Sequence, residues 1–492
     1  MATSLRKQDR NTVPSVASRL ELVLLQLLML WQDCLLAIIL EIPSVAPETN
    51  NSKKKTSRNM SDDEENLGHP DSCIRLASAV HRFKVPIIDP DQRLSFVKSF
   101  KTTGTHPKTK TLMLKADEAR KKVASALEAQ KVSHERVLAD SKRYLPFIHQ
   151  ILLSCKVQPE VARLDERLQF SWVSGLETER NFYQSEALMF DLVMSMVCEG
   201  LGNAGLATEA SIGGDFAAAS RYYKAAAGVF HFLAHTQLPT WSAKGSNVSE
   251  ESLPVECSVH VAEAMEKLFM ANAQQMAVAT VLIKPGVPNY GLLGKLCLGI
   301  SDELDKFTTK LRKEAFKLMT RVDKDIFALI NFQVALQKSL SLYFQARALW
   351  EKADYGNAIS LLSQATVELK TEKSGQGQGV PDVTQNKALK PLKDELTDLR
   401  NHYNKLLHSW EKDNSTVYFE SVPQQVPVDK RLQDGLVMGK MEPYSLAEVE
   451  PVLLILPDDT GGGGGSSRPA MERSDSDIAR DLQKRLNDGL DI

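Results

Sequence analysis

The sequence lacks the motifs by which many enzymes and metalloproteins are recognised. Its six cysteines are scattered without a CxxC pair, which excludes a zinc ribbon or thioredoxin-type site. A phosphate-binding GxxxxGK[ST] loop, a GxSxG turn and an HRD-type catalytic loop are also missing from the chain. We therefore expect buried free thiols in a reducing compartment, no enzyme activity, and no cofactor or metal.

The chain also has little net charge and few aromatic residues. Sixty basic residues face 62 acidic ones, and aromatic residues make up 7%. A dedicated nucleic-acid binder is usually strongly basic, so that class is disfavoured. A length of 492 residues, 43% of them hydrophobic, predicts a globular chain of two or three folding units.

Apolar residues recur at helical spacing over most of the chain. Leu112, Ala116, Ala119, Val123 and Leu127 follow one another at steps of three and four. Similar stripes occupy residues 181–201, 214–235, 255–284, 290–320, 323–352 and 386–411. Helices of this length pack naturally as antiparallel pairs, so the predicted fold class is all-α.

Two of these stripes resemble each other. One segment begins at Asp215-Phe216 and has Ala219 and Ala226. The other begins at Asp354-Tyr355 and has Ala358 and Ala365 at the same steps. Small residues at these steps allow close helix approach, which is typical of tetratricopeptide hairpins. Intervening copies are not evident, so we expect local hairpins and not a regular array.

Composition divides the chain into four parts. Residues 1–80 form an extension with a hydrophobic segment at 20–40 and a charged linker, 81–458 form the main domain, 459–473 a Gly/Ser-rich linker, and 474–492 an amphipathic helix. Within the main domain, order should begin near Phe83, and residues 416–422 should open a small extended or β strap folded back on the helices.

The hydrophobic segment at 20–40 has the length of a membrane span. It contains Glu21 and Asp33, and a central Asp costs roughly 2.5–3.5 kcal/mol on insertion. A buried or partner-covered amphipathic helix is the first interpretation, a membrane anchor the second, and an atypical extension the third.

Two local patterns suggest binding chemistry without completing it. His231 and His235 lie four residues apart, as metal ligands on a helix do, but no third ligand is evident nearby. The GQGQG run at 375–379 lies between helices and not after a buried strand, so it is interpreted as a linker. Packing or a surface pair is the preferred interpretation of the two histidines.

A basic stretch precedes the first long helical stripe and continues into it. Its members are candidates for contact with an anionic membrane surface, against the alternative of a solvated helix face. The candidate residues are Lys108, Lys110, Lys115, Lys121 and Lys122.

The stripe after Tyr290 carries more leucine than one narrow face can hold. Leu292 and Leu296 share a face, whereas Leu293 lies about 100° away from Leu292. Such a helix is either sandwiched in the core or leaves one apolar face for a partner helix.

Several of these segments resemble the BRO domain of endosomal ESCRT adaptors, the Alix/BROX-like family. The resemblance covers about residues 84–455 and rests on Phe170-Ser171-Trp172, on AAGVFHFL at 226–233, on Ala273-Gln274-Gln275, and on the segment KDNSTVYFESVP at 412–423. The last segment is the most specific, because it is similar to the family's Lys-x-Asn-x-x-Ile/Val-Tyr-x-x-x-Val-Pro element.

The resemblance implies an elongated, curved helical domain with a tetratricopeptide-like centre and no catalysis. It implies docking of the C-terminal helix of an ESCRT-III subunit during multivesicular-body sorting, through Leu292 and Leu296 with Lys295 beside them. The family's upstream aromatic contact falls near Ala277, and its acidic and basic contacts fall near Gly213 and Ala217. These departures remove an apolar surface and a polar pair.

The last predicted helix offers a separate candidate site. Ile478, Leu482 and Leu486 recur every four residues, and Arg485 completes a pattern that resembles MIT-domain ligands. The interpretations are an MIT ligand, a docked or autoinhibitory segment, or a tail without such a role.

The resemblance thus implies a non-enzymatic ESCRT-associated adaptor in the cytoplasm, peripheral to endosomes. The alternative is a tetratricopeptide-type co-chaperone or other peptide-binding module that grips a C-terminal carboxylate. That alternative would need convergent basic residues from neighbouring repeats.

Overall fold

The computed structural model describes residues 69–90, 94–128, 131–242, 250–371, 379–437 and 439–456. Helices dominate these residues, which confirms the all-α prediction. In chain order the elements are α2 (Asp71–Ala77), β1 (Ile87–Ile88), α3 (Phe96–Ser99), α4 (Pro107–Leu127), α5 (His134–Val157), β2 (Phe170–Val173), β3 (Phe182–Ser185), α6 (Leu188–Ile212), α7 (Phe216–Phe232), η1 (Leu233–Gln237), α8 (Leu238–Ser242), η2 (Glu250–Ser252), η3 (Val255–Cys257), α9 (Val259–Leu282), α10 (Tyr290–Glu314), α11 (Phe316–Met319), α12 (Lys324–Glu351), α13 (Tyr355–Glu368), η4 (Lys390–Leu392), α14 (Lys393–Asp413), η5 (Asn414–Tyr418) and η6 (Val428–Lys430).

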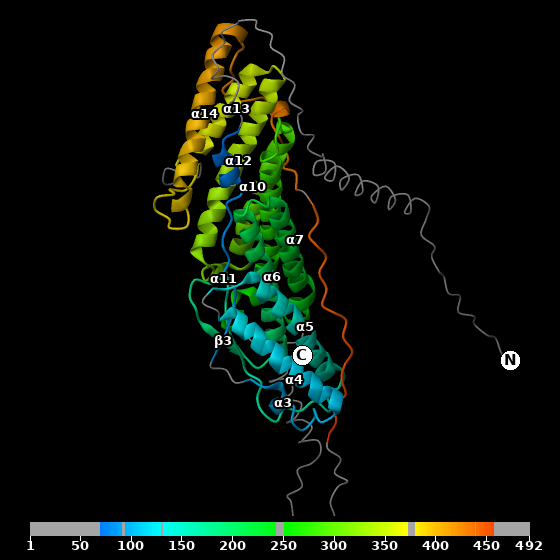
Figure 1. The fold of residues 1–492 in the computed structure, drawn as a ribbon. Helices are drawn as coiled ribbons and strands as arrows, with labels where there is room; N and C mark the ends of the chain where they lie inside the picture. The colour runs from blue at the N-terminus through cyan, green and yellow to red at the C-terminus, as the bar shows by residue number, and fades with distance from the viewer. Residues whose placement is uncertain are drawn as a thin grey trace, which may run out of the picture. The chain divides into compact units, whose positions relative to one another are not determined.

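The long helices pack in the order of the chain. From α4 to α14, each long helix contacts mainly the long helix before it and the one after it, and Figure 1 shows them side by side. Contacts between sequence neighbours are the mark of a helical solenoid.

The two similar segments open the second helix of two hairpins, α6–α7 and α12–α13. The Asp215 side chain accepts a hydrogen bond from the Ala218 amide and so caps α7. Ala219 and Ala226 of α7, like Ala358 and Ala365 of α13, are fully buried. This result confirms the prediction of tetratricopeptide-like hairpins.

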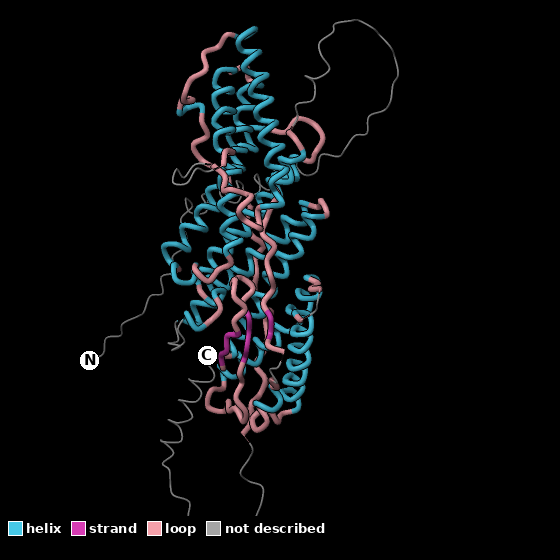
Figure 2. The backbone as a smooth tube through the Cα atoms, turned by 90° about the vertical axis from the view of Figure 1, so that its left-hand side faces the viewer, coloured by secondary structure: helices cyan, strands magenta, loops and turns pink. Residues whose placement is uncertain are grey.

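A small antiparallel sheet with the order β1-β2-β3 lies beside the helices (Figure 2). The helix expected over 181–201 is wrong at its start, because Phe182–Ser185 is strand β3. Aromatic Phe182 and Tyr183 favour a pleated surface, and this segment pairs with the fully buried strand β2. The apolar period of α6 begins only at Leu188.

The expectation of extended structure from residue 416 also needs correction. Residues 414–418 continue α14 as the π-helical turn η5, and Phe419 then reverses the chain with φ of 58°. The Asn414 side chain closes this turn, because its Oδ1 accepts from the Glu420 amide at 3.0 Å and its Nδ2 donates to the Glu420 carbonyl at 2.9 Å. The Asn414 side chain of the KDNSTVY segment therefore fixes the reversal of the chain after α14.

Beyond that turn, the chain runs back along the helices as a strap, residues 420–437 and 439–455. Backbone amides of the strap bond in turn to α12, α10, α7, α5 and the loop before α4, and Figure 1 shows its orange-to-red course. The bonds join Leu432 to Gln345 Oε1, Leu436 to the Lys295 carbonyl, Glu442 to the Lys224 carbonyl, Val452 to Ser154 Oγ, and Ile455 to the Thr103 carbonyl. Among the described residues the strap forms no β-strand.

The packed unit begins before the boundary expected at residue 81. Helix α2 buries Cys73, Leu76 and Ala77 completely. Gln333 Nε2 donates to the Leu76 carbonyl at 2.9 Å, and Gln275 Nε2 donates to the Ala77 carbonyl at 3.1 Å. Seven residues are too few to show a helical period, so the sequence pattern does not separate α2 from the charged stretch upstream.

Several predicted features fall outside the described residues. They are the hydrophobic segment at 20–40, the GQGQ part of the glycine run, the linker at 459–473, and the tail helix with Ile478, Leu482, Arg485 and Leu486. Within the described ranges, none of the helices combines the length and the apolar character needed to cross a membrane.

Two half-buried histidines give the fold a predicted pH dependence. Burial is the main cause that lowers the pKa of His81 and of His402 from 6.5 to about 4. The unfolded chain would take up these protons as the pH falls below about 6.5, whereas the folded chain would take them up only near pH 4. We therefore expect the free energy of unfolding to decrease between pH 7 and pH 4.

Urea unfolding of the wild type and of His402→Gln at pH 7 and pH 5 measures this effect. The variant should lose less stability than the wild type between the two pH values. Equal losses in the two proteins would contradict the assignment to His402.

Candidate partner-binding surface

The helix predicted to bind a partner is α10, which pairs with α9. The Asn289 side chain caps α10, because its Oδ1 accepts from the Leu292 amide at 3.0 Å. One side chain of α9, Gln274, then donates to the Leu296 carbonyl at 2.8 Å. These contacts fix the first two turns of α10 against α9.

The three predicted contact residues differ in exposure. Leu296 is only 2% exposed and belongs to the core, Leu292 is half-buried against that core, and Lys295 is exposed. The resemblance implies contacts through both leucines, but the structure places Leu296 in the core, so that Leu292 with Lys295 forms the accessible part.

The strap lies directly beside this part of α10. Gln274 Nε2 donates to the carbonyl of Leu436 at 2.8 Å as well as to that of Leu296. A Cβ added to Gly299 would lie 2.3 Å from the Leu436 carbonyl oxygen. The contact is thus backbone against backbone, and the strap forms one border of the surface.

The elements to which the family's other contacts map are adjacent in the structure. The Ser220 hydroxyl donates to the Ala273 carbonyl at 2.9 Å, so the first turns of α7 lie beside the C-terminal half of α9. Ala217 is exposed and Ala277 is half-buried. The structure therefore brings α7 and α9 together, and both mapped positions carry small alanine side chains.

Sequence reasoning missed two exposed apolar side chains that come just before α10 in the chain. Ile283 and Val287, in the connection from α9 to α10, are 49% and 77% exposed. The available signal was their place among Pro285, Gly286 and Pro288, where an apolar residue has no helix face to join. We name Leu292, Lys295, Ile283 and Val287 the α10 surface.

The five candidate membrane-contact lysines all lie on α4 and are exposed. Lys122 pairs with Glu118 at 2.6 Å, and both side chains remain largely solvated. Arg120 of the same stretch is buried and binds Asp191, so it adds no charge to the surface. Membrane contact by these lysines stays a prediction.

The cysteines of the described residues have the environment of structural thiols. Cys73, Cys155, Cys198, Cys257 and Cys297 are free and buried. Burial raises the pKa of Cys73 and of Cys155 to about 12, so their thiols are weak nucleophiles at neutral pH.

The structure is a stack of helical hairpins. A returning strap binds the stack along its length, and one surface of the stack is partly apolar. These features define a helical-repeat scaffold. A family model described as the BRO1-like domain matches residues 96–453. The chain therefore belongs to the BRO1-like domain family.

Individual relatives are distant in sequence. Over 308 residues the chain is 21% identical to "ALG-2 interacting protein X" of Dictyostelium discoideum, a match that covers 59% of this chain and 34% of that protein. The chain thus spans about a third of the length of that relative.

Solved structures share the fold. The structure named "ALIX BRO1 CHMP4C complex" aligns with a TM-score of 0.56 and 15% identity, over 75% of this chain and 96% of that one. "Structure basis for endosomal targeting by the Bro1 domain" aligns with a TM-score of 0.55 and 16% identity, over 74% of this chain and 93% of that one.

Proposed function

We propose that this protein is a non-enzymatic, ESCRT-associated adaptor that binds the C-terminal helix of an ESCRT-III subunit through the α10 surface. The observation that carries the proposal is the alignment of three quarters of the chain with a BRO1 domain solved together with CHMP4C. Half-buried Leu292 and exposed Lys295 in the first turns of α10 support it, together with exposed Ile283 and Val287 just before this helix, because an amphipathic helix docks on such a surface.

The proposal extends to endosomal sorting and to a cytoplasmic location at the endosome surface. The exposed lysines of α4 support peripheral membrane contact. Binding of an MIT-domain protein by the tail helix remains a prediction from the sequence. The co-chaperone alternative is weaker, because the α9–α10 hairpin separates the two similar hairpins and the chain belongs to the BRO1-like family.

Leu292→Asp combined with Lys295→Glu should weaken binding of ESCRT-III C-terminal peptides by about 10-fold or more. A fully buried leucine contributes about 1.5–3 kcal/mol, and the lower end applies because Leu292 is already half-buried. Isothermal titration with a panel of such peptides measures the change, and circular dichroism should remain that of the wild type.

Leu114→Asp is the matched control, because Leu114 is 54% exposed on the distant helix α4. It should bind the peptides as the wild type does. A wild-type chain that binds none of the peptides would reject the proposed function, whereas equal binding by the double variant would reject only the assigned surface.

A further inference from the structure

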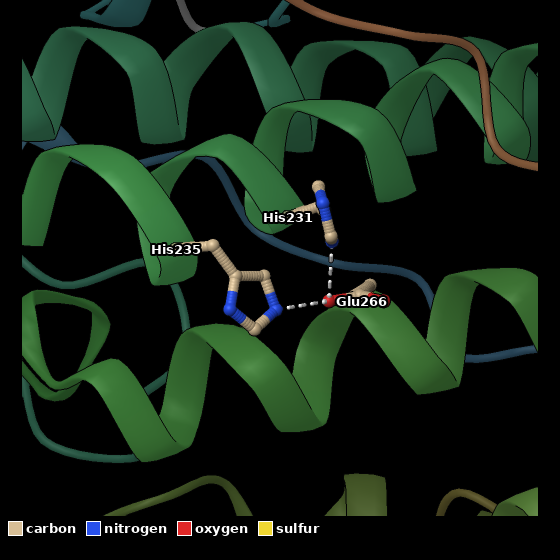
Figure 3. A group of neighbouring side chains, drawn as sticks. All are labelled: His231, His235 and Glu266. Carbon is tan, nitrogen blue, oxygen red and sulfur yellow. Dashed lines mark hydrogen bonds and ion pairs between the residues drawn. The ribbon is translucent and has the colours of Figure 1, made fainter. Parts of the chain in front are cut away.

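A second group of polar side chains lies away from the α10 surface, where α7 passes into the π-helical turn η1. His231 lies in the last turn of α7, His235 lies within η1, and Glu266 faces both from α9 (Figure 3). The sequence supplied the two histidines at helical spacing without a third ligand. The packing of α7 against α9 supplies the carboxylate.

The two imidazoles converge on one oxygen atom. His231 Nδ1 lies 3.1 Å and His235 Nε2 lies 3.5 Å from Glu266 Oε2, and the ligand atoms of the three residues all lie within 4.8 Å of one another. Ligands at about 2.0–2.1 Å from a tetrahedral zinc ion are about 3.3 Å apart. The two nitrogen-to-oxygen separations therefore match two edges of such a site.

The donor set selects the class of ion. Two imidazole nitrogens and one carboxylate oxygen suit zinc and similar divalent transition metals, whereas calcium and magnesium prefer oxygen ligands alone. The histidine side chains are each 46% exposed and that of Glu266 is 14% exposed. An ion could thus enter from solvent and keep a water as its fourth ligand.

No lysine or arginine competes for this carboxylate within the described residues, where both ion pairs of Glu266 are with these histidines. A second triad of His260, Glu263 and Glu314 provides the contrast. There, Lys310 Nζ lies 2.6 Å from Glu263 and 2.7 Å from Glu314, so a cation already neutralises the carboxylates.

We propose that His231, His235 and Glu266 form a surface site for Zn²⁺ or a similar divalent transition-metal ion, which would clamp the α6–α7 hairpin to the α9–α10 hairpin. This site is independent of the proposed partner-binding function. Its location adds a link to the strap, because Phe232 beside His231 packs on Tyr444 with ring centroids 5.4 Å apart.

Isothermal titration of the chelator-treated full chain with ZnCl₂ tests the site. We expect one ion per chain with micromolar affinity, and at least about 10-fold weaker binding for His231→Gln, His235→Gln and Glu266→Gln. His260→Gln is the matched control and should bind as the wild type does. Zinc should also raise the unfolding temperature of the wild type and of the control, but not of His231→Gln/His235→Gln.

X-ray absorption of the zinc-loaded wild type needs no variant and should show two imidazoles with oxygen ligands. Sulfur ligation, millimolar affinity in the wild type, or loss of binding only in His260→Gln would overturn the proposal.

Discussion

Asp191→Ala is expected to lower the free energy of unfolding by about 3–5 kcal/mol, because it leaves a buried arginine without its counter-ion. Asp191 is fully buried and accepts from Arg120 Nη2 at 3.1 Å, from the Tyr144 hydroxyl at 2.6 Å and from Trp172 Nε1 at 2.8 Å. These donors come from α4, α5 and β2, so the carboxylate joins the first helices of the stack to the sheet. Urea unfolding followed by circular dichroism measures the loss.

Two further variants show whether the loss of stability comes from the unpaired buried charge or from substitution in general. Glu118→Ala breaks the exposed pair with Lys122 and should leave stability close to that of the wild type. Arg120→Met combined with Asp191→Leu should be less destabilised than Asp191→Ala, since it removes both charges together. An Asp191→Ala protein within about 1 kcal/mol of the wild type would contradict this account.

The fold could be predicted to the extent that it depends on local patterns. The three- and four-residue steps placed α4, α7, α9, α10 and α12 correctly, because the side chains that set each period are also those that each helix buries. The same dependence on a period explains why the short elements were not predicted. Strand β3 and helix α2 contain too few residues for a period, and tertiary pairing decides their structure.

The candidate sites depended more on contacts between distant segments. Leu292 and Leu296 share a helix face, yet only Leu296 is fully buried, since exposure depends on where α9 lies. Glu266 could not be assigned to the two histidines before the packing of α7 on α9 was known. Asp191 did leave a signal, because a lone carboxylate in the apolar run LMFDLVMSMV must find a buried partner.

Gly299→Ala together with Gly228→Ala is expected to detach the middle of the strap while leaving the helices folded. The new Cβ at Gly299 would lie 2.3 Å from the Leu436 carbonyl oxygen, and the one at Gly228 would lie 2.0 Å from the Glu442 carbonyl oxygen. Backbone atoms cannot turn away as a flexible side chain can, so the strap must move. Hydrogen exchange in the strap should become at least about 10-fold faster.

The helices themselves should gain from the same change, because alanine is favoured over glycine in a helix by about 1 kcal/mol. Gly202→Ala in α6 is the matched control, since its new Cβ would meet no atom closer than 3.6 Å. It should exchange as the wild type does. Faster exchange in α7 and α10, and not in the strap, would mean that the two glycines serve the helices and not the passage of the strap. Unchanged hydrogen exchange in both the strap and the helices would mean that the strap does not hold the close backbone contact at Gly299. The strap would then not border the α10 surface.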